Sequence, residues 1–319
     1  MLKRQFERRH FLQLSAALGA SVCASRSGWA ASNPAARISL GYSLYGMRAF
    51  SLESAIDHAA EIGYDAIELA SIPGWPADPK LLSADARGQL AKQLARLGLG
   101  LPALMENWGL GVDDRAQAGQ LERLASVAQL GHELEPDHPP LIETVVGGKP
   151  GEWPTLKDKY VDRLGQWAEA AARAKTIVAI KPHRFGALNT PADAVWLVDQ
   201  VRSPWIRLAY DYSHFQFRDL PLAETLDVML PHTVFIHVKD TVLDKGQARF
   251  VLPGEGKFDF AALFGELKAR GWQGCVCVEV SAIVQKRPDY DPLAAARSSY
   301  EHLAQACSAA GAERTKRSA

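Results

Sequence analysis

Short apolar runs alternate with amphipathic stretches along most of this 319-residue chain. An apolar run of a few residues, such as the one at 176–183, is typical of a strand that is buried on both faces of a sheet. The stretch that follows each run has apolar residues at helical spacing, and the first such stretch, at 51–63, opens with a capping serine and closes with a glycine. The pattern predicts strands at 38–46, 65–71, 99–108, 139–148, 176–183, 206–215, 233–240 and 275–281, and helices at or near 51–63, 83–98, 114–132, 157–175, 190–201, 221–229, 258–270 and 292–308.

Eight strand–helix pairs in about 270 residues have the number and size of a (β/α)8 barrel. The competing α/β architecture, a doubly wound open sheet, usually has a glycine-rich first turn, and GYSLYG at 41–46 is not one. We therefore expect a single TIM barrel domain at 37–309. The polar segment 310–319 is expected to form a frayed, disordered tail.

The first 31 residues have the order of a signal peptide. ERRHFLQLSAALGA at 7–20 joins two arginines to an apolar run, and small residues suited to cleavage follow near Ala30 and Ala31. The Arg-Arg-x-Phe-Leu order resembles a twin-arginine signal, which implies the twin-arginine export machinery as a partner and a periplasmic or otherwise exported location. An amphipathic terminal helix is the alternative. The apolar run is too short for a stable membrane span.

The charge balance argues against a nucleic-acid partner. The whole chain has a formal net charge of zero, but residues 1–31 hold five basic residues and one acidic residue. The remainder has 31 basic and 35 acidic residues, a net charge of −4. A slightly acidic body is a poor surface for binding a phosphate backbone.

Ionisable side chains gather at the predicted strand ends, where TIM barrels carry their active sites. Three successive strands end in Asp211, His237 and Glu279, an oxygen and imidazole set that suits one divalent ion such as Mn, Mg, Co or Zn. Taken singly, each residue also fits a helix cap or a structural hydrogen bond. The other strand ends carry Glu68, Glu106, Glu143, Lys181, His183, His214, Lys239 and Asp240.

Several of these segments resemble the sugar phosphate isomerase/epimerase family of the xylose-isomerase-like barrel superfamily. The matching segments are AYDYSHF, FIHVKD, FVLPGEGKFDF and CVEVS, in that order, with GYDAIELA at the second strand. The resemblance covers about residues 38–305 and implies a carbohydrate substrate and one divalent metal ion. It implies Asp211, His237 and Glu279 as metal ligands, with His214 and His183 contacting the substrate.

The sequence departs from this family at the fifth strand. The usual Glu-x-His is Lys-Pro-His here, so that Lys181 replaces the expected fourth ligand, and a protonated lysine has no lone pair for a metal. Three interpretations remain open. Water, His183 or Glu143 completes the metal shell, with Glu143 alternatively pairing with Lys181; or Lys181 replaces the metal as a cation or base; or the site only binds ligand.

The resemblance implies two carboxylates that move a proton between the two faces of a carbon next to a carbonyl, and only Glu279 of that pair remains. We therefore expect an exported sugar or keto-sugar isomerase or epimerase, or else a keto-sugar or keto-glycoside lyase or dehydratase that uses Glu279 with Lys181, His183 or His214 as acid. A non-catalytic sugar-binding barrel is the third possibility. The particular sugar and the oligomeric state are left open. The further substrate-binding candidates are Glu143, Lys239, Trp108, Glu68 and Arg48.

Overall fold

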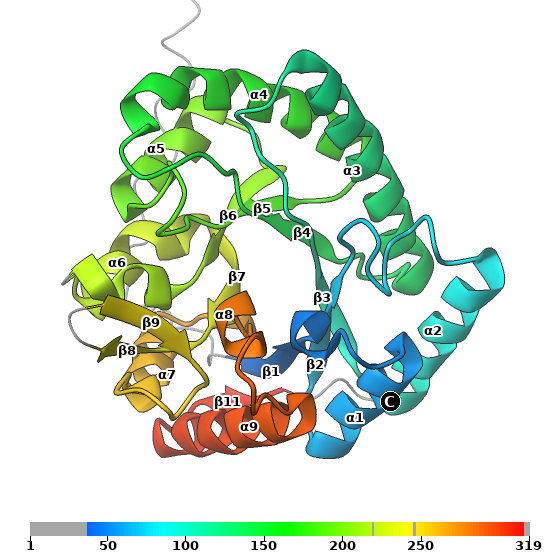
Figure 1. Ribbon diagram of the computed structural model, residues 1–319, viewed down its shortest axis with the longest axis vertical. Helices are drawn as coiled ribbons and strands as arrows, with labels where there is room; N and C mark the ends of the chain where they lie inside the picture. The colour runs from blue at the N-terminus through cyan, green and yellow to red at the C-terminus, as the bar shows by residue number, and fades with distance from the viewer. Residues whose placement is uncertain (1–36, 219, 245–246, 316–319) are drawn as a thin grey trace, which may run out of the picture. The chain divides into compact units, whose positions relative to one another are not determined.

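Eight parallel strands close into a barrel in this computed structural model, which describes residues 37–218, 220–244 and 247–315 (Figure 1). Each strand pairs with the next along the ring, and β10 pairs with β1 to close it. The predicted α/β class and TIM barrel are confirmed. The barrel strands are β1 (Arg37–Ser43), β2 (Ala66–Ala70), β3 (Gly100–Met105), β4 (Leu141–Thr144), β5 (Val178–Ile180), β6 (Ile206–Tyr210), β7 (Thr233–Val238) and β10 (Gln273–Val278).

The outer helices lie where the apolar spacing predicts them. Ser51 caps the first helix through a hydrogen bond to the backbone of Ser54, and Gly63 ends it in the left-handed conformation, which glycine adopts at low cost. The helices of the ring are α1 (Leu52–Ile62), α2 (Ala84–Leu97), α3 (Asp114–Leu134), α4 (Trp153–Ala174), α5 (Pro191–Val201), α6 (Leu222–Met229), α7 (Phe260–Ala269) and α9 (Pro292–Ala309), with short 3-10 turns η1 (Leu44–Met47), η2 (Tyr212–His214), η3 (Gln216–Arg218) and η4 (Leu230–His232).

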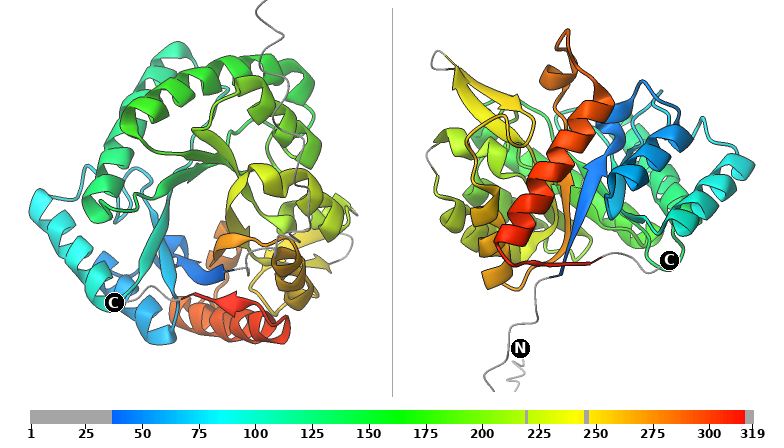
Figure 2. Two further views of the ribbon diagram at one scale, coloured as in Figure 1. Left: turned by 180° about the vertical axis from the view of Figure 1, so that it is seen from behind. Right: turned by 90° about the horizontal axis from the view of Figure 1, so that it is seen from below.

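Two elements at the carboxyl end of the barrel were not predicted. The connection after β7 is an antiparallel hairpin of β8 (Asp240–Asp244) and β9 (Gln247–Val251), and a short helix, α8 (Ala282–Gln285), follows β10. Both stand at the same end of the barrel (Figure 2). They therefore border the strand ends that carry the ionisable residues.

The expectation of a frayed tail from residue 310 is wrong for residues 310–315. β11 (Glu313–Arg314) pairs with β1, and the Arg314 guanidinium binds the carboxylate of Asp65 at 2.6 and 2.9 Å. Because Asp65 is buried and also accepts a hydrogen bond from the backbone N–H of Leu40, the arginine satisfies a charge inside the fold. The remaining residues 316–319 and the predicted signal peptide at 1–31 lie outside the described residues. No helix in the described part of the chain is long and apolar enough to cross a membrane.

Asp240 organises the loop between the hairpin and α7. Its buried carboxylate accepts four backbone N–H groups, from Thr241 at 2.7 Å, Gly254 at 3.2 Å, Gly256 at 3.0 Å and Phe258 at 3.2 Å. A carboxylate that accepts several N–H bonds replaces the water that a buried loop backbone has lost. Asp240 is therefore a structural residue, whereas its neighbour Lys239 turns toward the barrel axis, as its contacts below show.

Candidate active site

A cluster of ionisable side chains lies at the carboxyl end of the barrel, with Lys181 at its centre. Its members are Glu68, Glu143, Lys181, Asp211, His237, Lys239 and Glu279. The side chain of Lys181 is only 3% exposed. The ammonium nitrogen Nζ lies 2.9 Å from Nδ1 of His237, 2.9 Å from Oε2 of Glu279 and 3.3 Å from Oε1 of Glu143. These partners come from β7, from the end of β10 and from β4, so one lysine joins side chains from separate parts of the ring. The predicted pairing of Glu143 with Lys181 is confirmed.

Lys239 brings a second ammonium group to the same carboxylate. Its Nζ donates to Oδ2 of Asp211 at 2.6 Å and to Oε2 of Glu279. The lysine is buried, and the other oxygen of Asp211 accepts from the backbone N–H and the hydroxyl of Ser213 at 3.1 and 2.6 Å. One oxygen of Glu279 is thus held between two cations.

His237 has a defined tautomer. An ammonium group can only donate, so Nδ1 of His237 accepts from Lys181, and the ring proton is on Nε2, which donates to Oε2 of Glu68 at 2.9 Å. Glu68 and His237 are both fully buried. Glu68 orients His237 from inside the barrel, and its predicted contact with substrate stays a prediction.

The predicted metal ligands are close enough together for one ion, but all three residues already accept hydrogen bonds from lysines. One donor atom from each of Asp211, His237 and Glu279 lies within 4.8 Å of the others. Nδ1 of His237, Oε2 of Glu279 and Oδ2 of Asp211 each accept a hydrogen bond from Lys181 or Lys239. A divalent ion bound to all three would lie against two ammonium groups and would displace their hydrogen bonds. The donor set as arranged therefore does not fit a divalent ion, and the predicted metal stays a prediction.

Burial and the lysines set the ionisation of the cluster in opposite directions. Burial raises the pKa of Glu143 to about 7, although Lys181 and His237 lower it. Burial also disfavours the charges on Asp211 and Glu279, but the neighbouring ammonium groups outweigh it and hold the pKa of both carboxyls below the usual range. Burial lowers the pKa of Lys181, and the carboxylates of Glu143, Glu279 and Asp211 outweigh that effect, so its pKa lies above the ordinary value. Lys181 is a fixed cation.

Two neutral histidines lie beside these charges, with ring centroids 4.2 Å apart. Burial, together with the positive groups nearby, lowers the pKa of His183 to about 2, and burial lowers that of His214 to about 4. Nδ1 of His214 accepts from the backbone of Arg184 at 3.3 Å, so its protonated Nε2 faces Asp211 at 3.4 Å. Nδ1 of His183 accepts from the backbone N–H of Phe185 at 3.3 Å, which leaves the protonated Nε2 of this half-buried ring without a partner among the described residues.

Two residues at the predicted strand ends have side chains that contact other groups than the cluster. Trp108 is 5% exposed and packs edge-on against Trp167 in the hydrophobic core, which gives it a packing role rather than a stacking surface for a sugar. Glu106 is bound by Arg123 at 2.6 Å, and the same guanidinium binds Asp78 at 3.0 Å. That network joins the loops after β2 and β3.

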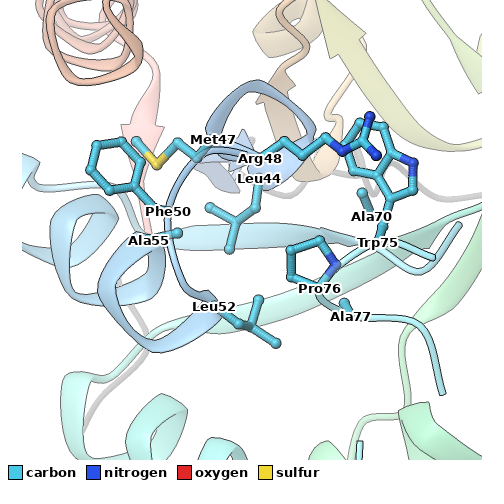
Figure 3. Close-up of a pocket in the computed structure, with 10 residues that line it drawn as sticks. All are labelled: Leu44, Met47, Arg48, Phe50, Leu52, Ala55, Ala70, Trp75, Pro76 and Ala77. Atoms are coloured by element: carbon cyan, nitrogen blue, oxygen red, sulfur yellow. The ribbon is translucent and has the colours of Figure 1, made fainter. Parts of the chain in front are cut away.

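An aromatic group at the mouth was not predicted. Tyr45, which follows β1, stacks on Trp75 with ring centroids 4.8 Å apart and planes within 8°. The predicted substrate contact Arg48 lies over the same indole, 4.4 Å from its centroid, beside an apolar crevice formed by η1 and the segment after β2 (Figure 3). Tyr45 has a raised pKa because of burial first and the negative charge of Glu279 second, so it lies near the cluster. In the sequence, Tyr45 and Trp75 come near the ends of the first two predicted strands, and this position is the signal from which the aromatic group could have been predicted.

Phe250 lies against His214 and Lys239. This hairpin residue of β9 lies 5.1 Å from the ring of His214 and 5.2 Å from Nζ of Lys239. Phe185, half exposed, lies 6.2 Å from it. Because sequence reasoning treated residues 240–251 as a simple connection, it could not place this ring over the site.

A closed α/β barrel with its ionisable residues at the carboxyl end defines the chain as a TIM barrel of the kind that carries enzyme sites. Residues 56–306 match the family described as xylose isomerase-like TIM barrel, and the chain belongs to this family. The predicted family resemblance is confirmed at this level.

Individual relatives are more distant. The L-ribulose-5-phosphate 3-epimerase UlaE of Salmonella paratyphi C (strain RKS4594) is 27% identical over 130 residues, which are 41% of this chain and 45% of that protein. The chain thus matches less than half the length of this curated relative. The 3-keto-D-glucoside 4-epimerase YcjR from E. coli in its apo form has a TM-score of 0.65 at 21% identity, covering 84% of this chain and all of that one. IolI, solved with a bound zinc atom, has a TM-score of 0.69 at 19% identity, covering 85% and 98%.

Proposed function

We propose that this protein is a sugar isomerase or epimerase that removes a proton from the carbon next to a carbonyl group. The observation that carries the proposal is the position of Glu279, whose side chain is 14% exposed while the other carboxylates of the cluster, at Glu68, Glu143 and Asp211, are at most 1% exposed. A base must reach its substrate, and Glu279 reaches the mouth of the barrel. The similarity to epimerases of ketose phosphates and keto-glycosides supports a carbonyl-containing sugar as the substrate class.

The chemistry follows from the charges around Glu279. Its carboxylate takes the proton from the carbon, the C–H electron pair forms the new C=C bond, and the π pair of the carbonyl group moves onto its oxygen. The resulting enolate oxygen accepts hydrogen bonds from ammonium groups that Glu279 shared before the substrate arrived. Losing part of that stabilisation makes Glu279 a stronger base when substrate is bound, because its low pKa in the free protein depends on Lys181 and Lys239.

Return of the proton decides between two reactions. Delivery to the opposite face of the same carbon gives the epimer. Delivery to the former carbonyl carbon gives the isomer, because the hydroxyl group on the first carbon loses its proton and becomes the new carbonyl. A second candidate, elimination, is favoured by the Nε2–H of His183, for which the described part of the chain offers no acceptor. In that reaction the enolate expels an oxygen substituent from the next carbon, and the Nε2–H of the neutral His183 donates a hydrogen bond to this oxygen. The proton that Glu279 removed returns to the departing oxygen, and an unsaturated ketone and an alcohol or water result.

The test is proton exchange in deuterated water. We would incubate the protein with a panel of ketopentoses, ketohexoses, their phosphates and 3-keto-glucosides, and follow the carbon next to the carbonyl by NMR. Solvent deuterium should enter that carbon, and Glu279→Gln should reduce the rate at least 100-fold. Glu301→Gln is the matched control, because this exposed residue of α9 lies outside the cluster.

The products separate the candidates. An epimer or isomer that carries deuterium supports the main proposal, whereas an ultraviolet-absorbing unsaturated ketone and a released alcohol support elimination. Sugars that bind in calorimetry without exchange, and with affinity altered by Glu279→Gln, would make the protein the non-catalytic binding barrel.

We also propose that the protein is exported through the twin-arginine system. The support is the Arg8–Arg9 pair ahead of an apolar run. Fractionation of cells that express the full chain should place the mature protein outside the cytoplasm, and replacement of both arginines by lysine should retain the uncleaved chain inside. Equal distribution of the two forms would contradict this proposal.

A further inference from the structure

We propose that the ammonium group of Lys181 takes the position and the charge of the divalent cation at the centre of this barrel, so that the site works without a metal ion. The role of Lys181 in the reaction rests on the proposed function, whereas the metal-binding test below does not depend on it. The proposal starts from a disagreement already described, since each of the three residues that could hold an ion accepts a hydrogen bond from a lysine, at Nδ1 of His237, Oε2 of Glu279 and Oδ2 of Asp211.

The charge balance supports this substitution. A carboxylate ligand at position 181 together with a divalent ion would bring one negative and two positive charges to the cluster. Their sum is one positive charge, which is the charge of Lys181 alone. The carboxylates of Glu143, Asp211 and Glu279 thus meet the same net charge in both arrangements, and adding a divalent ion beside Lys181 would exceed it.

The hydrogen bonds of Lys181 fix its ammonium group at one position in the cluster. Nζ of Lys181 is bonded to His237 and Glu279 at 2.9 Å each, and the third contact, to Glu143 at 3.3 Å, leaves Oε1 of that carboxyl without a well-aligned hydrogen bond. Two close acceptors hold the ammonium group in place. A substrate oxygen would share the N–H groups of Lys181 and Lys239 with Glu279.

Lys181 and Lys239 both donate to Oε2 of Glu279, so two ammonium groups meet at this one oxygen. Such a pair can bind the carbonyl oxygen and stabilise the negative charge that develops when Glu279 removes the proton. Unlike a metal ion, the two ammonium groups need no free coordination positions and are not removed by chelators.

The test is metal binding, measured without any sugar. The full chain, purified without a histidine tag and dialysed against EDTA, is titrated with MnCl2 and with ZnCl2 by calorimetry and by the electron paramagnetic resonance of Mn²⁺. We expect the wild type to bind neither ion at the cluster. Lys181→Glu, which restores a carboxylate beside Asp211, His237 and Glu279, should bind one equivalent of Mn²⁺ at least 100-fold more tightly.

Lys92→Glu is the matched control, since it makes the same charge change on an exposed position of α2 and should leave Mn²⁺ binding as weak as in the wild type. One equivalent of either ion in the wild type, lost in Asp211→Ala, would overturn the proposal, and so would a folded Lys181→Glu that gains no site. If Lys181→Glu does not fold, the wild-type titration decides alone.

Activity gives an independent outcome. Deuterium exchange that continues unchanged in 10-fold excess EDTA supports both proposals. Exchange that EDTA abolishes and MnCl2 restores would overturn the lysine proposal and leave the isomerase proposal standing. Absence of exchange with every sugar would refute the isomerase proposal, while the titration would still decide whether Lys181 replaces the ion.

Discussion

Replacing Asp240 by asparagine should unfold the loop that supports the hairpin over the active site. The substitution keeps the shape of the side chain and removes one of its two acceptor oxygens. Each oxygen of Asp240 accepts two backbone N–H groups, Oδ1 from Thr241 and Phe258 and Oδ2 from Gly254 and Gly256. Whichever way the amide turns, two N–H groups then face an NH2 group that cannot accept from them.

The magnitude follows from these two lost bonds. An unsatisfied buried N–H costs about 1–3 kcal/mol, so Asp240→Asn should destabilise the barrel by about 2–6 kcal/mol. For a chain of this size each kcal/mol lowers the melting temperature by roughly 2–4 °C, which gives a fall of roughly 4–24 °C. The side chain is 1% exposed, so water cannot replace the missing acceptor without opening the loop.

Asp259→Asn provides the matched control nineteen residues along the chain. Asp259 is exposed and caps α7 through one hydrogen bond to the backbone of Ala262 at 2.9 Å. Asparagine caps a helix about as well as aspartate, so this variant should change stability by less than about 1 kcal/mol. Thermal unfolding of both variants, followed by circular dichroism, makes the comparison.

Unfolding of this loop should also weaken substrate binding at the active site. Asp240 follows Lys239 directly and opens the hairpin that carries Phe250 over His214. The Asp240→Asn variant should therefore show a raised KM in the deuterium-exchange assay at a temperature where it is still folded. Melting temperatures that agree within 2 °C for the two asparagine variants would refute the role assigned to Asp240.

Two further substitutions test the packing around this loop and the carboxyl-terminal strand. Gly256→Ala should destabilise the protein by several kcal/mol, because the new Cβ would lie 2.1 Å from Oδ1 of Asp240. The control, Gly265→Ala on α7, places its Cβ in open space and should stabilise the protein by about 0.5–1 kcal/mol. Equal melting temperatures for the two variants would contradict the steric argument. Arg314→Ala should cost about 1–3 kcal/mol in urea denaturation, because it leaves the buried Asp65 carboxylate with a neutral partner only, and an unchanged midpoint would show that β11 is not docked in solution.

The amino-acid sequence by itself determined the order and approximate bounds of the eight barrel strands and their helices. Local physics is sufficient for this result, since apolar runs, helical spacing, a serine cap such as Ser51 and a terminal glycine such as Gly63 act within a few residues. The sequence also determined which strand ends carry ionisable groups. Because parallel barrel strands all end on the same side, it followed that Lys181, Asp211 and Glu279 share one mouth.

Only the tertiary structure decided which of these groups touch. Lys181 meets His237 across 56 residues and Glu279 across 98, and Glu68 meets His237 across 169. Such pairings depend on the register of the closed barrel and on the side of each strand from which a side chain points, which no local pattern encodes. The same holds for Phe250 over the site and for Arg314 on Asp65. The sequence identified Lys181 as a departure from the motif that it resembles, and only the closed barrel placed its charge against His237 and Glu279.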